Sequence, residues 1–154
     1  MEVRRFARAP GGQIRLQLPV HERQILRELA ETVRALVGED DAAVGRLFPP
    51  AYEDEELERE YRQLTRAQLT ARHEQALLLM QETVDRDVLS QAEGDAWLRG
   101  LNDARLVLGT ALDIAEDFDW GALDPGDPRA PDLALYAYAS WLQEQLVEVS
   151  AGPD

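Results

Sequence analysis

The chain has no cysteine and no lysine among its 154 residues, and it has only two histidines. Without cysteine there is no disulfide framework that would argue for export, and no thiol that could serve as a nucleophile or a redox sensor. No apolar run approaches the ~20 residues that a membrane-spanning helix requires. The N-terminus has arginines but no apolar segment after them, so it does not look like a secretion signal. We therefore expect a cytoplasmic protein without a membrane partner.

Positive charge is also scarce. The formal net charge is −14, because 16 basic residues, all arginine, stand against 30 acidic residues. Residues 1–34 contain seven arginines and four glutamates, a balance of +3, so the remaining residues carry −17. A field of this sign repels nucleic acid and anionic membranes at long range. A locally basic N-terminus on an acidic body is the main electrostatic asymmetry of the chain.

The length and the hydrophobic pattern predict a single domain over residues 1–154. The expected fold is mainly α: a compact helical domain of about five helices with an N-terminal two-stranded β-hairpin. Residues 3–18 form the hairpin, because Ile14, Leu16 and Leu18 alternate with polar residues after a Pro-Gly-Gly turn signal at positions 10–12. Residues 19–149 form the helical body, and residues 150–154 form a tail.

Capping residues and helix-terminating residues predict where the helices begin and end. Asp40 or Asp41 caps a short second helix, and Thr65 and Ser90 each begin a capping box. Residues 54–64 form a highly charged segment with Glu–Arg pairs four residues apart. Asp132 caps the last helix after a loop over residues 115–131. The predicted helices are residues 19–37, 40–47, 65–84, 90–112 and 133–149.

The hairpin arginines are candidates for contact with nucleic acid, because β-ribbons in DNA-binding proteins place such residues against phosphates. The alternative is ordinary protection of edge strands by charge. We favour the alternative and expect no direct DNA binding, because phosphate contacts would have to overcome the field of the acidic body. The candidates are Arg4, Arg5, Arg8 and Arg15.

Arg105 stands out because it falls in the middle of an apolar helical stripe formed by Leu101, Leu108 and Leu112. A charge in this position must be paired or must extend to water. It could bind an anion or a partner's carboxylate, or it could pair with an acid from residues 113–119 or 53–60. We favour an internal ion pair, since arginine is the usual cation in buried pairs.

The last predicted helix is apolar on more than one side. One stripe faces the expected core, while other large apolar residues lie on the opposite side or on a flank. A helix that is apolar nearly all round is buried on all sides. In a domain this small, a homodimer or a protein partner is as good an explanation as burial within the chain. The interface candidates are Leu133, Tyr136, Trp141 and Val147.

Residues for catalysis or metal binding are few. His73 lies on an apolar stripe and is expected to be half-buried and hydrogen-bonded, and His21 is expected to be exposed. There is no His-Glu-x-x-His motif, no Glu-x-x-His pair and no nucleotide-binding glycine motif. The acidic run between Asp113 and Asp119 lacks the order of a calcium loop. We expect no enzyme activity, no catalytic residue, no metal and no cofactor.

Several segments resemble, in order along the chain, an actinobacterial domain-of-unknown-function family that includes the oxidative-stress regulator (AosR-like) proteins. The segments are Arg4-Arg5-Phe6 with Gly11-Gly12, Leu47–Tyr52, Tyr61–Thr65, Leu101–Thr110 and Trp141–Val147.

The resemblance implies a regulator that acts by binding, with stress-linked transcriptional regulation as its role. The partner would be a sigma factor or RNA polymerase. The alternative is an accessory or adaptor factor for Clp-type proteolysis, because the family's genes tend to lie near a Clp adaptor gene. The chain departs from a thiol-based sensor in one respect: without cysteine no disulfide switch can operate in it.

Overall fold

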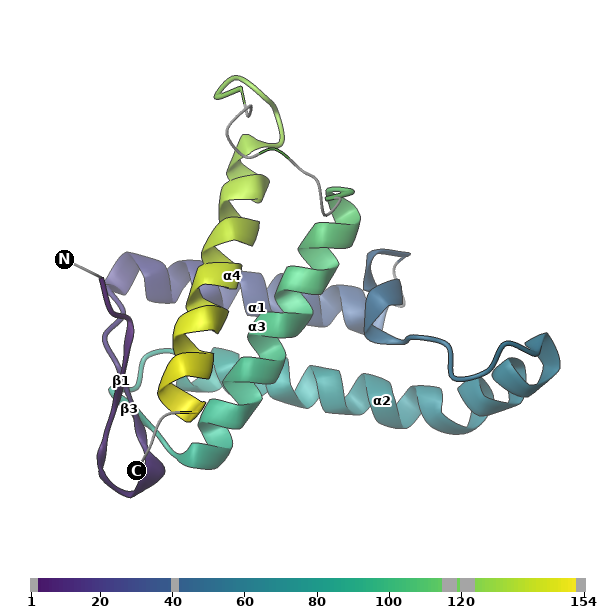
Figure 1. The fold of residues 1–154 in the computed structure, drawn as a ribbon, viewed down its shortest axis with the longest axis horizontal. Helices are drawn as coiled ribbons and strands as arrows, with labels where there is room; N and C mark the ends of the chain where they lie inside the picture. Colours follow the sequence, from purple (N-terminus) through teal and green to yellow (C-terminus); the bar gives the residue numbers. More distant parts are fainter. Residues whose placement is uncertain (1–2, 40–41, 115–118, 120–123, 152–154) are drawn as a thin grey trace.

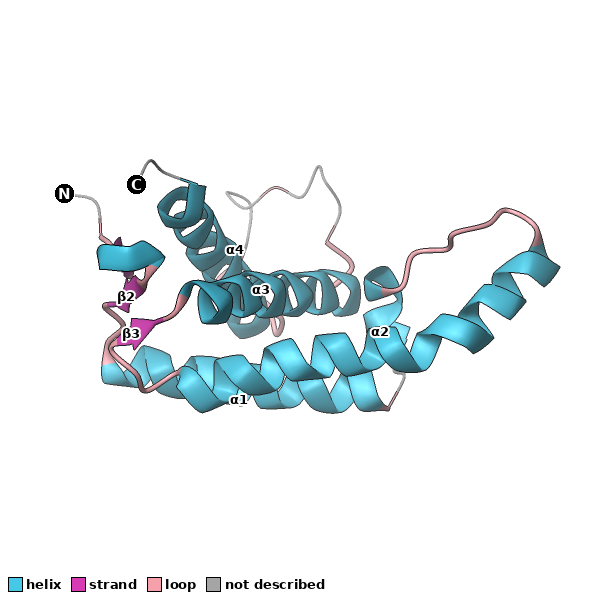
Figure 2. Ribbon diagram, turned by 90° about the horizontal axis from the view of Figure 1, so that it is seen from below, coloured by secondary structure: helices cyan, strands magenta, loops and turns pink. Residues whose placement is uncertain are grey.

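The computed structural model describes residues 3–39, 42–114, 119 and 124–151. These residues include four α-helices: α1 (Val20–Gly38), α2 (Glu55–Thr83), α3 (Gln91–Ala111) and α4 (Ala130–Ala151). Figures 1 and 2 show them in two layers, with α1 and α2 side by side and the pair α3 and α4 crossing over them. The mainly α prediction is confirmed, although the helices number four rather than about five within the described residues.

The N-terminal hairpin is confirmed and belongs to a small three-stranded sheet. Its strands β1 (Phe6–Arg8) and β2 (Ile14–Leu16) are antiparallel, with Phe6 opposite Leu16. A short 3₁₀ turn (Pro10–Gly12) joins them, in which both glycines have positive φ. The unexpected third strand, β3 (Val88–Leu89), pairs with β2. Two residues are too few to show an alternating pattern, so the sequence carried no signal for β3.

The core lies between the two helical layers and extends under the sheet. Trp97 of α3 is fully buried, meets Phe6 of β1 edge to face, and donates its indole N–H to Thr83 at 2.7 Å. Gly94 lies where β2 crosses α3, and a Cβ at this position would come within 2.5 Å of the Ile14 side chain. The contact would be with the terminal carbon of Ile14, so the packing of this side chain on α3 depends on the absence of a side chain at residue 94.

The predicted helix start at Thr65 is wrong, because α2 is one continuous helix. Asp54 caps it by accepting hydrogen bonds from the backbone N–H groups of Glu56 and Leu57. The Thr65 hydroxyl does not cap a helix but donates to the Tyr61 carbonyl one turn earlier, at 2.7 Å. A threonine within a helix commonly makes this bond. The capping box at Ser90, in contrast, is confirmed at the start of α3.

Two other predicted boundaries also change. α4 begins at Ala130, two residues before the predicted cap Asp132, after a turn in which Asp127 accepts from the Arg129 backbone N–H. The predicted short second helix is a 3₁₀ helix, η2 (Ala42–Leu47), and its predicted caps Asp40 and Asp41 lie outside the described residues. Of the predicted loop over residues 115–131, residues 119 and 124–131 are described. Residues 119 and 124–129 contain no helix or strand, and residues 130–131 belong to α4.

Candidate functional site

The hairpin is tied to α1 and α4 by a half-buried polar cluster, the hairpin clamp, which consists of Arg5, Glu22, Tyr138 and Gln145. The Arg5 guanidinium donates two hydrogen bonds to the Glu22 carboxylate, at 2.9 and 2.7 Å, and the Tyr138 hydroxyl donates to the same carboxylate at 2.5 Å. The Gln145 amide accepts from the Arg5 backbone N–H and donates to the Val3 carbonyl. Gln145 of α4 thus pairs with one backbone donor and one backbone acceptor of the segment just before β1.

Electrostatics within the hairpin clamp favour the charged pair. The Arg5 hydrogen bonds lower the pKa of Glu22, with a smaller contribution from Tyr138, although burial opposes this shift. Burial raises the pKa of Tyr138, and its bond to the Glu22 carboxylate raises it further. The Arg5 guanidinium also lies 5.5 Å from the centroid of the Trp141 ring. The pair is therefore ionised at neutral pH, and the Arg5 guanidinium is bound to Glu22 and Trp141 within the chain.

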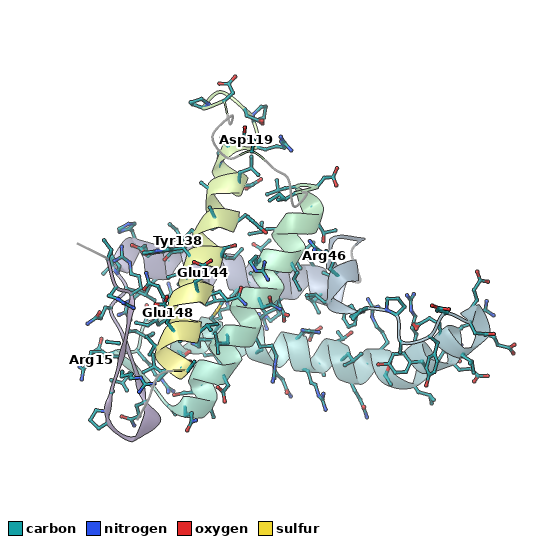
Figure 3. The ribbon with its side chains drawn as sticks, viewed as in Figure 1. Arg15, Arg46, Asp119, Tyr138, Glu144 and Glu148 are labelled. Atoms are coloured by element: carbon teal, nitrogen blue, oxygen red, sulfur yellow. The ribbon has the colours of Figure 1, made fainter. Side chains whose placement is uncertain are left out.

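Three of the four hairpin arginines have partners inside the protein. In addition to Arg5, the Arg4 side chain pairs with Glu148 at 3.3 Å, and Arg8 donates to the Val149 carbonyl at 3.0 Å. Figure 3 shows Tyr138 and Glu148 on the side of α4 toward the hairpin, whereas the exposed Arg15 lies on the hairpin itself. The hairpin arginines therefore do not form one free basic surface, and they serve mainly to hold the hairpin against α4.

His73 and Asp103 form a second polar pair, between α2 and α3. The His73 Nδ1 atom lies 2.7 Å from an Asp103 carboxylate oxygen, and the imidazole meets the Phe48 ring edge to face. The Asp103 side chain is 3 % exposed, and this burial raises its pKa against the opposing bond from His73. A carboxylate that orients an imidazole is part of many general-base arrangements, which also need a nucleophile. Within the described residues, the pair joins α2 to α3.

Arg105 differs from the prediction in its partners. Its guanidinium donates to the amide oxygens of Gln143, at 2.9 Å, and of Asn102, at 3.0 Å. The sequence had predicted a carboxylate partner from residues 113–119 or 53–60. Neutral acceptors suffice because Arg105 is only half-buried, so water still screens its charge. The resulting group of three residues links α3 to α4.

The four interface candidates of α4 have different environments. Leu133 is fully buried within the chain, and Trp141 packs on Tyr138 and Arg5. Tyr136 is half-buried, and its ring occupies the space beside Gly109 of α3. Val147 is 47 % exposed. Burial within the chain therefore accounts for most of the apolar surface of α4.

The N-terminal half of α2 is the surface that sequence reasoning missed. We define residues 55–75 as the α2 arm, because the first buried residue of this helix is Ala76. Figure 2 shows this end of α2 extending beyond α1 and α3. One side of the α2 arm is covered by the segment before it, through contacts of Tyr52 with Tyr61 and of Phe48 with Arg66. Leu57 and Leu64, one turn before and one turn after Tyr61 along the helix, are nevertheless 49 % and 79 % exposed.

A hollow of about 580 Å³ lies at the tip of the hairpin, next to the first turn of α3 and the last turn of α4. Gly11 and Gly12 are among the residues that line it, and Arg8 and Asp95 supply one charge of each sign. The hollow thus offers no concentration of charge that would select a ligand.

The described residues contain neither a metal-binding cluster nor a membrane-spanning helix. No cluster of three or more metal-ligating His, Asp or Glu side chains occurs within the described residues. None of the described helices is both long and apolar enough to cross a membrane.

The chain belongs to the family described as Domain of unknown function (DUF2017), whose family model matches residues 3–150. This confirms membership in a domain-of-unknown-function family and covers both the hairpin and the helical body. No curated protein and no solved structure matches the chain.

Proposed function

We propose that this member of the DUF2017 family is a non-enzymatic interaction protein, and that the α2 arm is its partner-binding surface. The observation that carries the proposal is the exposure of Leu57 and Leu64 on a helix whose first 21 residues contain no buried side chain. A single exposed leucine is ordinary on a protein surface, but an apolar face on a projecting helix is a common means of protein recognition.

The α2 arm is held in a defined orientation, which a binding surface requires. Asp54 caps its first turn, and Glu58 accepts from the backbone N–H groups of Ala51 and Tyr52 while it pairs with Arg62. At the other end, the His73–Asp103 pair joins α2 to α3. A surface that is ordered before binding loses less conformational entropy when the partner binds.

The resemblance to actinobacterial oxidative-stress regulators supports stress-linked regulation of transcription as the role of this interaction. The partner would then be a sigma factor or RNA polymerase rather than DNA, because Arg4, Arg5 and Arg8 already have internal partners. Without cysteine in the chain, the stress signal would reach this protein through that partner.

The test is a pull-down of tagged protein from its own host, with identification of partners by mass spectrometry and reconstitution from purified components. We expect RNA polymerase or a sigma factor in stoichiometric amount with the wild type, and its loss with Leu64→Glu. Val147→Glu, a charge at an exposed position of α4, is the matched control and should retain the partner. Stoichiometric Clp components would instead support the adaptor role. A partner that both variants retain would exclude the α2 arm as the surface.

A further inference from the structure

Four exposed residues immediately before α2 form a short proline-rich segment. We call residues Pro49–Tyr52, with the sequence Pro-Pro-Ala-Tyr, the proline segment. All four residues are exposed, Tyr52 at 49 %. Phe48, directly before them, is buried in the same core cluster as Leu77 and Val107. The proline segment is therefore anchored in the core at one end and open to a partner along its length.

The conformation of the proline segment is largely fixed before any partner binds. Proline holds its own φ at about −65°, and a residue that precedes a proline is restricted to extended or polyproline II backbone. Both restrictions apply to Pro49, which precedes Pro50. At the other end, Glu58 of α2 accepts from the backbone N–H groups of Ala51, at 2.7 Å, and of Tyr52, at 3.1 Å. A ligand that is ordered in advance loses less conformational entropy when it binds.

The backbone of the proline segment offers a partner hydrogen-bond acceptors but no donor. Pro49 and Pro50 have no N–H group, and the N–H groups of the next two residues are bound to Glu58. The carbonyl groups of the segment accept no hydrogen bond from the residues that the structure describes. Exposed proline and tyrosine rings beside free carbonyl groups are the features that aromatic-lined grooves recognise in proline-rich ligands. In such a groove, tryptophan and tyrosine side chains supply both the ring faces and the N–H or O–H donors.

The proline segment lies on the same side of the α2 arm as the exposed leucines. Leu57, Tyr61 and Leu64 are spaced by four and then three residues, so they share one face of the helix. The Tyr52 ring meets the Tyr61 ring edge to face, with centroids 5.8 Å apart, in the middle of this face. A partner that binds the leucines would therefore also reach the proline segment.

Acidic side chains next to the proline segment set the charge that a partner must bring. Glu53, Glu55 and Glu56 are exposed, and none of them forms an ion pair with a residue that the structure describes. Glu58, in contrast, is paired with Arg62. Charge that is not compensated within the chain favours a partner of the opposite charge. The groove that receives the proline segment should therefore have a basic rim.

We propose that the proline segment docks in an aromatic-lined groove of a protein partner, and that this groove has a basic rim. The two proline rings and the Tyr52 ring fill the groove, the backbone carbonyl groups accept from its aromatic donors, and the exposed glutamates pair with its rim. Leu57 and Leu64 extend the contact along α2. The proposal rests on the proposed function, since it takes this side of the α2 arm to be the partner-binding surface. It adds the segment that the partner recognises and the chemistry of the partner's groove.

The first experiment is an NMR titration of the isotopically labelled full chain with a WW domain selected for Pro-Pro-x-Tyr peptides. This domain is the probe because its groove presents aromatic faces to proline-rich ligands. We expect saturable binding, with the largest amide shifts at Ala51 and Tyr52. Pro50→Ala and Tyr52→Ala should each weaken binding about tenfold or more, whereas Pro125→Ala, at an exposed proline outside the segment, should bind as the wild type does. The circular dichroism of all three variants should be unchanged, because these side chains are exposed. Absence of binding, shifts centred elsewhere in the chain, or binding that the first two variants retain would overturn the proposal.

The second experiment uses the partner captured in the pull-down, purified and titrated with the full chain. Tyr52→Ala should weaken this complex about as much as Leu64→Glu does. Glu53→Gln combined with Glu56→Gln should reduce the dependence of binding on salt, and an unchanged dependence would refute the basic rim. If the partner is lost with Leu64→Glu but retained by Pro50→Ala and Tyr52→Ala, this proposal is refuted and the proposed function stands. If the WW domain binds through the proline segment but the pull-down yields no partner, the regulatory role is refuted and recognition of the segment by an aromatic groove stands.

Discussion

Replacing Arg5 by methionine tests whether the hairpin clamp holds the sheet on the helices. Methionine retains most of the side-chain length but removes both hydrogen bonds to Glu22, whose side chain is 9 % exposed. Breaking a fully buried ion pair costs about 3–5 kcal/mol, because the remaining charge loses its compensation. The Arg5 side chain is 19 % exposed and Tyr138 still donates to Glu22, so we expect the lower figure of about 2–3 kcal/mol.

The dependence on pH distinguishes an ion pair from packing. Because Arg5 lowers the pKa of Glu22, the pair's contribution to stability is fully present above the pKa of glutamate in the unfolded chain, about 4.3. The contribution is lost as the pH falls through the lower pKa of the folded state. In Arg5→Met, burial is no longer opposed by the guanidinium, so the pKa of Glu22 should rise. The difference in stability between wild type and variant should therefore shrink from pH 7 to about pH 3.

The assay is urea unfolding followed by circular dichroism at pH 7 and near pH 3, with Arg15→Met as the matched control on the same hairpin. Arg15 is exposed, so its replacement should change stability by no more than about 0.5 kcal/mol. If Arg5→Met and Arg15→Met had equal effects at pH 7, the hairpin clamp would contribute nothing to stability. A loss for Arg5→Met that did not vary with pH would show that packing on Trp141, and not charge, is responsible.

Substitutions at two further residues, Gly94 and Asp103, test the contacts between helices and strands. Gly94→Ala should lower stability by about 1 kcal/mol, because the new methyl group would force the terminal carbon of the buried Ile14 side chain out of its place, while the higher helix propensity of alanine offsets part of this cost. An unchanged or higher urea midpoint would contradict this. Asp103→Ala should cost about 2–4 kcal/mol in the same assay, because it removes the hydrogen-bond partner of the His73 Nδ1 atom and leaves a buried space. Asp103→Asn, which keeps an oxygen in place, should cost less, and equal losses would refute the hydrogen bond as the cause.

Local signals in the sequence identified most of the fold. The alternation of Ile14 and Leu16 with polar residues predicted the hairpin, and the capping box at Ser90 predicted the start of α3. Both signals could be recognised because they involve residues close together in the chain. The break predicted at Thr65 failed for a physical reason. A threonine hydroxyl can cap a helix or bond to a carbonyl one turn earlier, and the local sequence does not distinguish these two uses.

The polar partners could not be predicted in the same way, because they are distant along the chain. Gln145 lies 140 residues from Arg5, and Asp103 lies 30 residues from His73. One signal was nevertheless present: Glu22 falls on the apolar stripe of α1 with Leu26 and Leu29, which indicates a paired charge. The same reasoning applied to Arg105 predicted a carboxylate partner, whereas its guanidinium donates to the amide oxygens of Gln143 and Asn102.

The charge asymmetry of the sequence has a different meaning once the chain is folded. The basic N-terminus suggested a surface for nucleic acid, but Arg5 turns inward to Glu22 of α1, and Arg4 pairs with Glu148 of α4 at the surface. Their charge is therefore used to hold the hairpin in place. The second asymmetry, between residues 53–60 and 61–73, is also partly compensated, because Arg62 pairs with Glu58 and Arg66 packs on Phe48. What the α2 arm offers a partner is therefore chiefly its exposed leucines, Leu57 and Leu64. Charge that is compensated within the chain cannot select a partner, so recognition is better assigned to the α2 arm than to the hairpin.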